Sequence, residues 1–244
     1  MSACPHKKNR TEHATPPPLR EHEIHVWTIS LNVPVDELRD MQKLLSPDET
    51  ERALRFASPP LRRRHICAHA ATRSILALYL DIGPREIVIG TEKAGKPFIQ
   101  DPTNRGIHFN LSHTGDTALL AIARDAPVGV DVEAIRDLPE WKSLASRFLS
   151  EREVHQLHRL PENKQPGAFY HFWVRKEAYL KGIGTGIALG LPSFSVQIGR
   201  GFEEVHDPSC KTKWYVAELE APEDFVAAIA TPVGKPRLRY FEWD

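Results

Sequence analysis

The stretch Leu45-Ser46-Pro47-Asp48-Glu49 recurs in altered form as Leu149-Ser150-Glu151-Arg152-Glu153, about one hundred residues further along the chain. Both copies carry the S-x-x-E pattern of a capping box, in which serine and glutamate side chains bind free N–H groups at a helix start. Residues 116–123 (DTALLAIA) and 224–230 (DFVAAIA) match at a similar separation. These repeats predict a chain built from two related halves. The alternative is a chance match of short segments.

Each half is expected to contain a capped helix, a longer helix and then strands. The periodicity predicts the longer helices over 63–80 and 167–183, and strands over 23–31, 87–89, 117–123, 194–198 and 214–218. We therefore predict an α+β fold of two similar α/β halves related by a pseudo-two-fold axis, with a ligand-binding crevice between them. The expected boundaries are a disordered tail over 1–20, an N-terminal half over 21–125 and a C-terminal half over 126–244.

The composition excludes several classes of protein. Of the 244 residues, 41% are apolar, which is enough for a hydrophobic core without stabilising disulfides or metals. The 32 basic residues balance the 32 acidic ones. This balance argues against nucleic-acid or membrane partners. Cys4, Cys67 and Cys210 form no CxxC pair, so neither a disulfide framework nor a thiolate zinc site is expected. Because no window approaches the roughly 20 apolar residues of a membrane helix, we expect a cytoplasmic protein.

Two carboxylates lie close together in Gly129-Val130-Asp131-Val132-Glu133. On a strand, Asp131 and Glu133 at i and i+2 point to the same face. Two such charges between apolar neighbours are unfavourable unless a cation neutralises them, and a hard divalent cation would do so. The alternative is an edge strand with a solvated acidic face.

A second charged group lies in the segment from Phe172 to Lys181. Trp173, Glu177 and Lys181 fall at i, i+4 and i+8 on one helical face. A Glu-to-Lys pair at this spacing is also a common surface stabiliser worth about 0.2–0.5 kcal/mol. The apolar residues around the rest of this helix favour a buried helix. Buried charges are costly unless they are paired or bind a metal, so Glu177 and Lys181 are expected to have such partners.

Magnesium typically binds one or two carboxylates together with phosphate oxygens and waters. Asp131, Glu133 and Glu177 therefore suit a Mg²⁺ that also binds a pyrophosphate. Lys181, one turn beyond Glu177, is placed to neutralise charge on a transferred phosphoryl group.

Other polar segments are candidates for phosphate binding. Asn110 to Asp116 follows an apolar run and predicts a loop in which Ser112 and His113 cradle phosphate oxygens, or else a solvated turn. A Ser-His hydrolase is disfavoured because no G-x-S-x-G elbow is present. The turn Gly95-Lys96-Pro97-Phe98 and the run Arg62-Arg63-Arg64 are either solvated surface or phosphate contacts.

Taken together, the ordered segments GKPF (95–98), FNLSHTGD (109–116), GVDVE (129–133) and FWVRKEAYLKGIGTGI (172–187) resemble the motif set of the 4′-phosphopantetheinyl transferases. The resemblance covers roughly residues 24–218 and extends to the length and the repeat. It points to the monomeric surfactin-synthetase-activating type rather than to the half-length trimeric synthases. It implies coenzyme A as co-substrate, Mg²⁺ as cofactor, and apo acyl or peptidyl carrier proteins as acceptors.

The resemblance also implies roles for individual residues. The metal ligands would be Asp131, Glu133 and Glu177, and the catalytic residues Glu177, Lys181 and His113. Contacts to coenzyme A would come from Arg52, Arg64, Gly95, Lys96, Ser112, His113 and Lys181. Arg52 is the least well matched, because Glu49 stands where some members have a lysine.

Two other functions remain open at this point. A non-catalytic coenzyme A or nucleotide-binding protein of the same fold predicts binding without transfer. An RNA- or DNA-binding module using Arg62 to Arg64 predicts salt-dependent binding, but it lacks a recognised motif.

Overall fold

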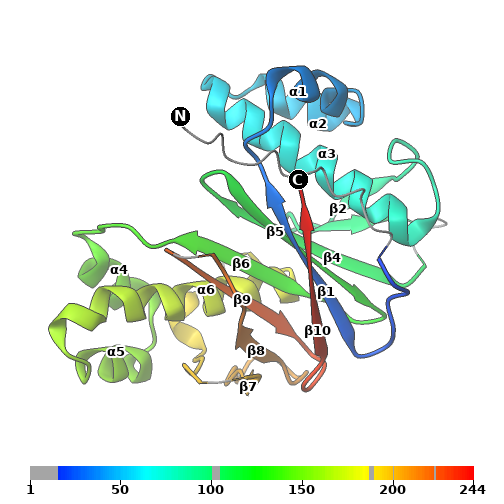
Figure 1. The fold of residues 1–244 in the computed structure, drawn as a ribbon. Coiled ribbons are helices and arrows are strands. Elements are labelled where there is room, and N and C mark those ends of the chain that lie inside the picture. Colours follow the sequence, from blue (N-terminus) through cyan, green and yellow to red (C-terminus); the bar gives the residue numbers. More distant parts are fainter. Residues whose placement is uncertain (1–15, 101–104, 187–189, 200, 223) are drawn as a thin grey trace, which may run out of the picture.

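The computed structural model describes residues 16–100, 105–186, 190–199, 201–222 and 224–244. The helices are α1 Val35–Gln42, α2 Pro47–Leu54, α3 Pro59–Leu80, α4 Trp141–Phe148, α5 Glu151–His158 and α6 Gln165–Ile183, with short 3₁₀ turns η1 Glu162–Lys164 and η3 Leu191–Ser193. The strands are β1 Glu23–Ser30, β2 Ile89–Thr91, β3 Pro97–Ile99, β4 Ile107–Thr114, β5 Thr117–Arg124, β6 Gly129–Ala134, β7 Glu203–Glu204, β8 Tyr215–Glu218, β9 Phe225–Thr231 and β10 Arg237–Trp243. The predicted α+β class is confirmed (Figure 1).

The strands form two larger sheets that share one pattern. The first has the order β10-β1-β5-β4, the second has the order β6-β9-β8-β7, and β2 and β3 pair separately. In both sheets an early strand pairs antiparallel with a strand from later in the chain, β1 with β5 and β6 with β9. Helices α1 to α3 lie over the first sheet and α4 to α6 lie beside the second (Figure 1). This order of elements supports the predicted repeat, while the symmetry axis stays a prediction.

Both predicted capping boxes are confirmed. Ser46 Oγ accepts from the Glu49 N–H at 3.2 Å, and the Glu49 carboxylate accepts from the Ser46 N–H at 2.8 Å. Ser150 and Glu153 make the same reciprocal bonds at 3.3 and 2.7 Å. The two boxes therefore start α2 and α5 in the same way.

The glutamate of each box also binds the long helix that follows. Arg73 of α3 donates to Glu49 at 2.6 Å, and Lys176 of α6 donates to Glu153 at 2.8 Å. Burial alone would raise the pKa of Glu49, but hydrogen bonds from His69 and Arg73 lower it to about 2. Each half thus joins its short and long helices through an ion pair that involves the capping residue.

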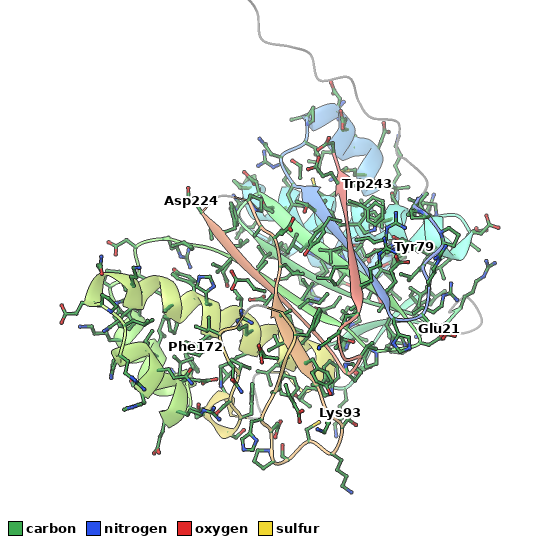
Figure 2. All side chains as sticks on the ribbon, turned by 60° about the horizontal axis from the view of Figure 1, so that its bottom comes forward. Glu21, Tyr79, Lys93, Phe172, Asp224 and Trp243 are labelled. Atoms are coloured by element: carbon green, nitrogen blue, oxygen red, sulfur yellow. The ribbon has the colours of Figure 1, made fainter. Side chains whose placement is uncertain are left out.

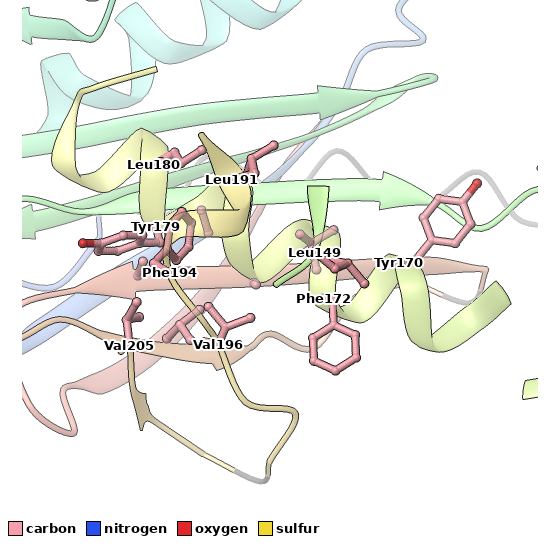
Figure 3. Close-up of a cluster of buried hydrophobic side chains, with 14 of the residues drawn as sticks. Leu149, Tyr170, Phe172, Tyr179, Leu180, Leu191, Phe194, Val196 and Val205 are labelled. Atoms are coloured by element: carbon pink, nitrogen blue, oxygen red, sulfur yellow. The ribbon is translucent and has the colours of Figure 1, made fainter. Parts of the chain in front are cut away.

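The described residues form four apolar clusters, of which a small one packs α1 and α2 on α3. Ile75 and Leu120 belong to the core between α3 and the first sheet. Trp243 is part of this core and Tyr79 packs against it, and both are labelled in Figure 2. The core around α6 lies against the second sheet, where Tyr179 and Phe194 make an edge-to-face contact (Figure 3). A third layer fills the space between the two sheets, and its residues include Ile24, Val26, Leu119, Ala121, Val130, Val132, Ala227 and Ile229.

Several expectations need correction. The predicted strand over 194–198 is wrong, because only an isolated bridge joins Ser195 to His206 there. Phe194 and Val196 are nevertheless buried in the core around α6, which accounts for the apolar pattern. The strand predicted at 87–89 begins at Ile89, and Ile87 is a buried residue before it.

The chain ends also depart from expectation. Strand β10 was not predicted, and it pairs parallel with β1 so that the last residues complete the first sheet. The predicted disordered tail over 1–20 lies mostly outside the described residues, but Leu19 is buried in the first core, so ordered chain begins before residue 20. In the described part of the chain, no helix combines the length and apolarity needed to cross a membrane.

Candidate active site

The edge strands of the two sheets, β4 and β6, come into contact at the centre of the molecule. Side chains of β4 bridge the two strands. Asn110 Oδ1 accepts from the Val130 N–H at 2.8 Å, and Ser112 Oγ–H donates to Asp131 Oδ1 at 2.8 Å. The loop predicted to begin at Asn110 is wrong, because β4 continues to Thr114. Asn110 and Ser112 are residue types common in turns, which favoured the loop prediction. In the structure their side chains make hydrogen bonds to the neighbouring strand β6.

Gly129 explains why a glycine begins the acidic strand. A Cβ atom at this position would lie 2.7 Å from the Cα of Gly182 and closer still to the carbonyl oxygen of Ala178. Helix α6 therefore runs directly against β6. Since alternate strand residues share a face, Asp131 and Glu133 face α6 together with Gly129.

The carboxylates meet Lys181 of α6. Lys181 Nζ donates to Asp131 Oδ1 at 2.6 Å and to Ser112 Oγ at 2.8 Å. Burial, reinforced by the charge of Asp131, raises the pKa of Glu177 to about 7, and the same two causes raise the pKa of Glu133. The predicted strand face and helix face thus form one acidic cluster, in which Asp131 and Glu177 are buried and Glu133 is partly exposed, with a single lysine directly bound to it among the described residues.

The cluster has the chemistry of a cation site. Asp131 Oδ2 and Glu177 Oε1 are buried and have no hydrogen-bond partner among the described residues. Unpaired buried carboxylate oxygens are costly, and oxygen ligands are those that Mg²⁺ prefers. Across the described residues, no three His, Cys, Asp or Glu side chains form a ready metal centre, and Lys181 supplies the neighbouring positive charge. By their chemistry, the two unpaired oxygens of Asp131 and Glu177 fit a hard divalent cation.

Positive side chains surround the end of β4. His113 is exposed there, and desolvation by its neighbours together with the charges of Lys181, His69 and Arg64 lowers its pKa. Arg64 donates to Asp116 at 2.8 Å. These groups form a basic rim beside the acidic cluster. Arg52 instead lies exposed on α2.

Lys96 was expected to be solvated or to contact phosphate, but in the structure its ammonium group binds main-chain carbonyl oxygens. It borders a cavity of about 230 Å³ that is also lined by Gly95, Asn110, Glu177 and Lys181. Its ammonium group donates to the carbonyl oxygens of Gly182 and Val128, the latter at 3.3 Å. Burial lowers the pKa of Lys96 to about 8. Lys96 therefore joins the β2–β3 hairpin to the end of α6 and the start of β6.

Sequence reasoning missed Asn110, Thr114 and the close contact at Gly129. Thr114 lies on the same face of β4 as Asn110 and Ser112. A signal was present, since Asn110, Ser112 and Thr114 are polar at i, i+2 and i+4 after an apolar run, as on one face of a strand.

Two families match separate parts of the chain. Residues 127–230 match the family described as the 4′-phosphopantetheinyl transferase superfamily, and residues 31–125 match the family described as 4′-phosphopantetheinyl transferase, N-terminal. The 4′-phosphopantetheinyl transferase HetI of Nostoc sp. is 36% identical over 87% of this chain and 89% of its own length.

Two Bacillus proteins are also similar. The 4′-phosphopantetheinyl transferase psf-1 of Bacillus pumilus is 31% identical over 73% of this chain and 77% of its own length. The 4′-phosphopantetheinyl transferase Sfp of Bacillus subtilis is 28% identical over 80% of this chain and 85% of its own length. The chain belongs to the 4′-phosphopantetheinyl transferase superfamily and is of the Sfp-like type.

Proposed function

We propose that this enzyme transfers the 4′-phosphopantetheine group of coenzyme A to a serine of apo acyl or peptidyl carrier proteins, and that it requires Mg²⁺. The observation that supports this most strongly is the cluster of Asp131, Glu133 and Glu177 beside Lys181. A protein that only bound a nucleotide would have little use for three neighbouring carboxylates, two of which, Asp131 and Glu177, are buried. In the reaction, the serine oxygen forms a bond to the β-phosphorus while the bond from that phosphorus to the bridging oxygen breaks. Adenosine 3′,5′-bisphosphate leaves.

Glu177 is proposed to accept the serine proton, directly or through a water. A general base works best when its pKa lies near the working pH. Burial beside Asp131 raises the pKa of Glu177 to about 7 before a cation binds, and a carboxylate that binds Mg²⁺ is a weaker base than a free one. The residue faces the 230 Å³ cavity that Lys181 also lines. The proton, the acceptor and the phosphoryl group can therefore meet at one place.

Lys181 is proposed to stabilise the charge that develops on the phosphoryl oxygens. It has three N–H groups, of which two are bound to Asp131 and Ser112, so the third remains for a substrate oxygen. Asp131, Glu133 and Glu177 would hold Mg²⁺. When bound, the cation supplies charge neutralisation for the pyrophosphate and for the acidic cluster.

The basic rim at the end of β4 is proposed to bind the nucleotide part of coenzyme A. Arg64 presents a positive charge there, and its fork suits phosphate geometry, while His113, whose pKa is lowered, offers a neutral ring N–H donor. Lys96, Gly95 and Arg52 are proposed to assist from the hairpin turn and from α2. The N-terminal half would thus bind the nucleotide, while the C-terminal half carries the carboxylates and Lys181.

The proposed setting is a cytoplasmic monomer that acts on carrier proteins and binds neither nucleic acid nor membrane. The balanced charge and scattered cysteines support it.

A transfer assay with Glu177→Gln tests the catalytic proposal. The substitution preserves size but removes the proton acceptor and the charge, so turnover should fall steeply at saturating Mg²⁺ while coenzyme A still binds. Undiminished turnover would remove Glu177 from both proposed roles. Omitting divalent cations from the wild-type reaction tests the Mg²⁺ requirement separately.

A further inference from the structure

A second cavity lies among the start of β4, the end of α6 and the segment before β8. Its volume is about 470 Å³, against about 230 Å³ for the cavity beside the acidic cluster. Of the residues proposed above for catalysis, metal binding or coenzyme A binding, Lys96 alone is among its described lining residues. Volumes of this size are typical of small-molecule sites. The proposed reaction gives this cavity no role.

The walls of this larger cavity are mainly aromatic and aliphatic. Phe98, Phe109 and Trp214 line it together with Ile107 and Ile183. Small-molecule sites usually combine such walls with a few polar groups that fix the orientation of the ligand. Aromatic rings pack favourably on one another edge to face or with an offset. The walls therefore favour a ligand with a flat aromatic body.

Lys96 passes from the smaller cavity to the larger one. Its stem runs past Gly184, where an added Cβ atom would lie 3.2 Å from Lys96 Cδ, and Gly184 lines the smaller cavity. Its ammonium group donates to the carbonyl oxygens of Gly182 and Val128. Gly182 and Pro127 line the larger cavity. The stem thus borders the smaller cavity, and the charge borders the larger one.

This ammonium group has no direct counter-ion. Both of its acceptors are neutral carbonyl oxygens, and no carboxylate among the described residues lies within 4 Å of it. Glu92 also lines the cavity, but it is exposed and acts on Lys96 only from a greater distance. Because buried charges are costly unless they are paired, and because one N–H of Lys96 is still free, an anionic acceptor would stabilise this group.

The remaining titratable group in the wall does not compete for an anion. Burial, together with the charge of Lys96, lowers the pKa of His108. Its ring is therefore mainly neutral at neutral pH and offers hydrogen bonds without a second charge. The pKa of Lys96 is lowered to about 8, which leaves its ammonium group mainly protonated at the same pH.

We propose that the larger cavity is a second small-molecule site, separate from the coenzyme A site, and that it takes an aromatic compound carrying a carboxylate or another anionic group. The aromatic body would pack against the aromatic walls, and the anion would lie beside Lys96. This inference goes beyond the proposed function and does not depend on carrier transfer.

Fluorescence titration of the full chain with anilinonaphthalene sulfonate, an aromatic anion, tests the proposal. The titration is run without divalent cations, with and without saturating coenzyme A. Phenylnaphthylamine provides the same aromatic body without a charge. Thr212→Phe adds a ring at an exposed residue that lines the cavity. Lys213→Phe is the matched control, because Lys213 is the next exposed residue and is not among the lining residues.

The proposal expects one equivalent of the anionic probe to bind. Thr212→Phe should weaken this binding by about tenfold or more because the added ring takes up ligand space, whereas Lys213→Phe should stay within about twofold of the wild type. The uncharged analogue should bind at least about tenfold more weakly, because it lacks the attraction to the Lys96 ammonium group. Saturating coenzyme A should leave the probe bound.

Four results would overturn the proposal. Displacement of the probe by coenzyme A would assign the cavity to the coenzyme A site, and equal affinity of the uncharged analogue would refute an anionic ligand. Unchanged binding to a folded Thr212→Phe protein would place the probe elsewhere, and no binding to the wild type would refute the site. Thermal melting checks folding. If Thr212→Phe does not fold, the displacement and analogue measurements on the wild type still decide.

Discussion

Replacing Gly129 by alanine tests the contact that brings β6 and α6 together. The added Cβ would lie 2.7 Å from the Cα of Gly182 and closer to the carbonyl oxygen of Ala178, where atoms essentially never approach within 3.0 Å. Main-chain atoms border it on the helix side, so no flexible side chain can move away. Strand and helix must therefore separate, which also moves Asp131 and Glu133 relative to Glu177.

The size of the effect follows from overpacking. Extra methylenes in a well-packed core cost about 1–3 kcal/mol, and a main-chain clash belongs at the upper end. For a chain of this size, about 3 kcal/mol corresponds to a melting temperature about 6–12 °C lower. We expect this decrease by calorimetry, together with a loss of turnover.

Gly167→Ala is the matched control. It lies in the same helix, α6, with nothing within 4 Å of a Cβ. Because alanine favours helix by up to about 1 kcal/mol over glycine, this variant should be as stable as the wild type or slightly more stable. If Gly129→Ala melts like the wild type and like this control, the close packing of β6 on α6 is wrong.

Three further predictions concern charged side chains. Lys176→Met leaves the fully buried Glu153 carboxylate without its cation and should cost about 3–5 kcal/mol in urea denaturation, whereas Lys213→Met, at an exposed ion pair, should leave the stability nearly unchanged. Equal costs would contradict the role of the buried pair. The pKa of Glu49 is about 2 in the folded state against 4.5 ordinarily, so its stabilisation of about 3 kcal/mol is present above pH 4.5 and lost as the pH falls towards 2. Glu49→Gln should flatten that part of the stability-pH curve, and an unchanged curve would exclude this carboxylate as its source. Lys181→Met should lower kcat by about 10²–10³ in the transfer assay. A kcat equal to that of the wild type would show that Lys181 does not assist the reaction.

Local signals predicted α2, α3, α5 and α6, but not the short helices α1 and α4. The S-x-x-E boxes at Ser46 and Ser150 place the starts of α2 and α5, because capping depends on residues within one turn. The apolar run around Glu177 correctly indicated that α6 is buried, and the i, i+2 spacing of Asp131 and Glu133 correctly placed them together in β6.

Features that depend on distant partners were not predictable in the same way. Strand β10 is defined by its parallel pairing with β1, more than half the chain away, and no local pattern specifies such a partner. The polar residues from Asn110 to Thr114 suggested a loop, because only the nearby β6 gives their side chains a reason to lie on a strand. The position of Lys96 likewise depends on carbonyl groups from two other elements.

Mass spectrometry of a panel of apo carrier proteins, each incubated with this enzyme, coenzyme A and Mg²⁺, tests the central claim most directly. The same reactions with Asp131→Ala provide the control. We predict a mass gain of one phosphopantetheine on at least one carrier with the wild type and none with the variant. The absence of any gain, despite tight binding of coenzyme A, would contradict the proposed transfer and favour a protein that only binds the nucleotide.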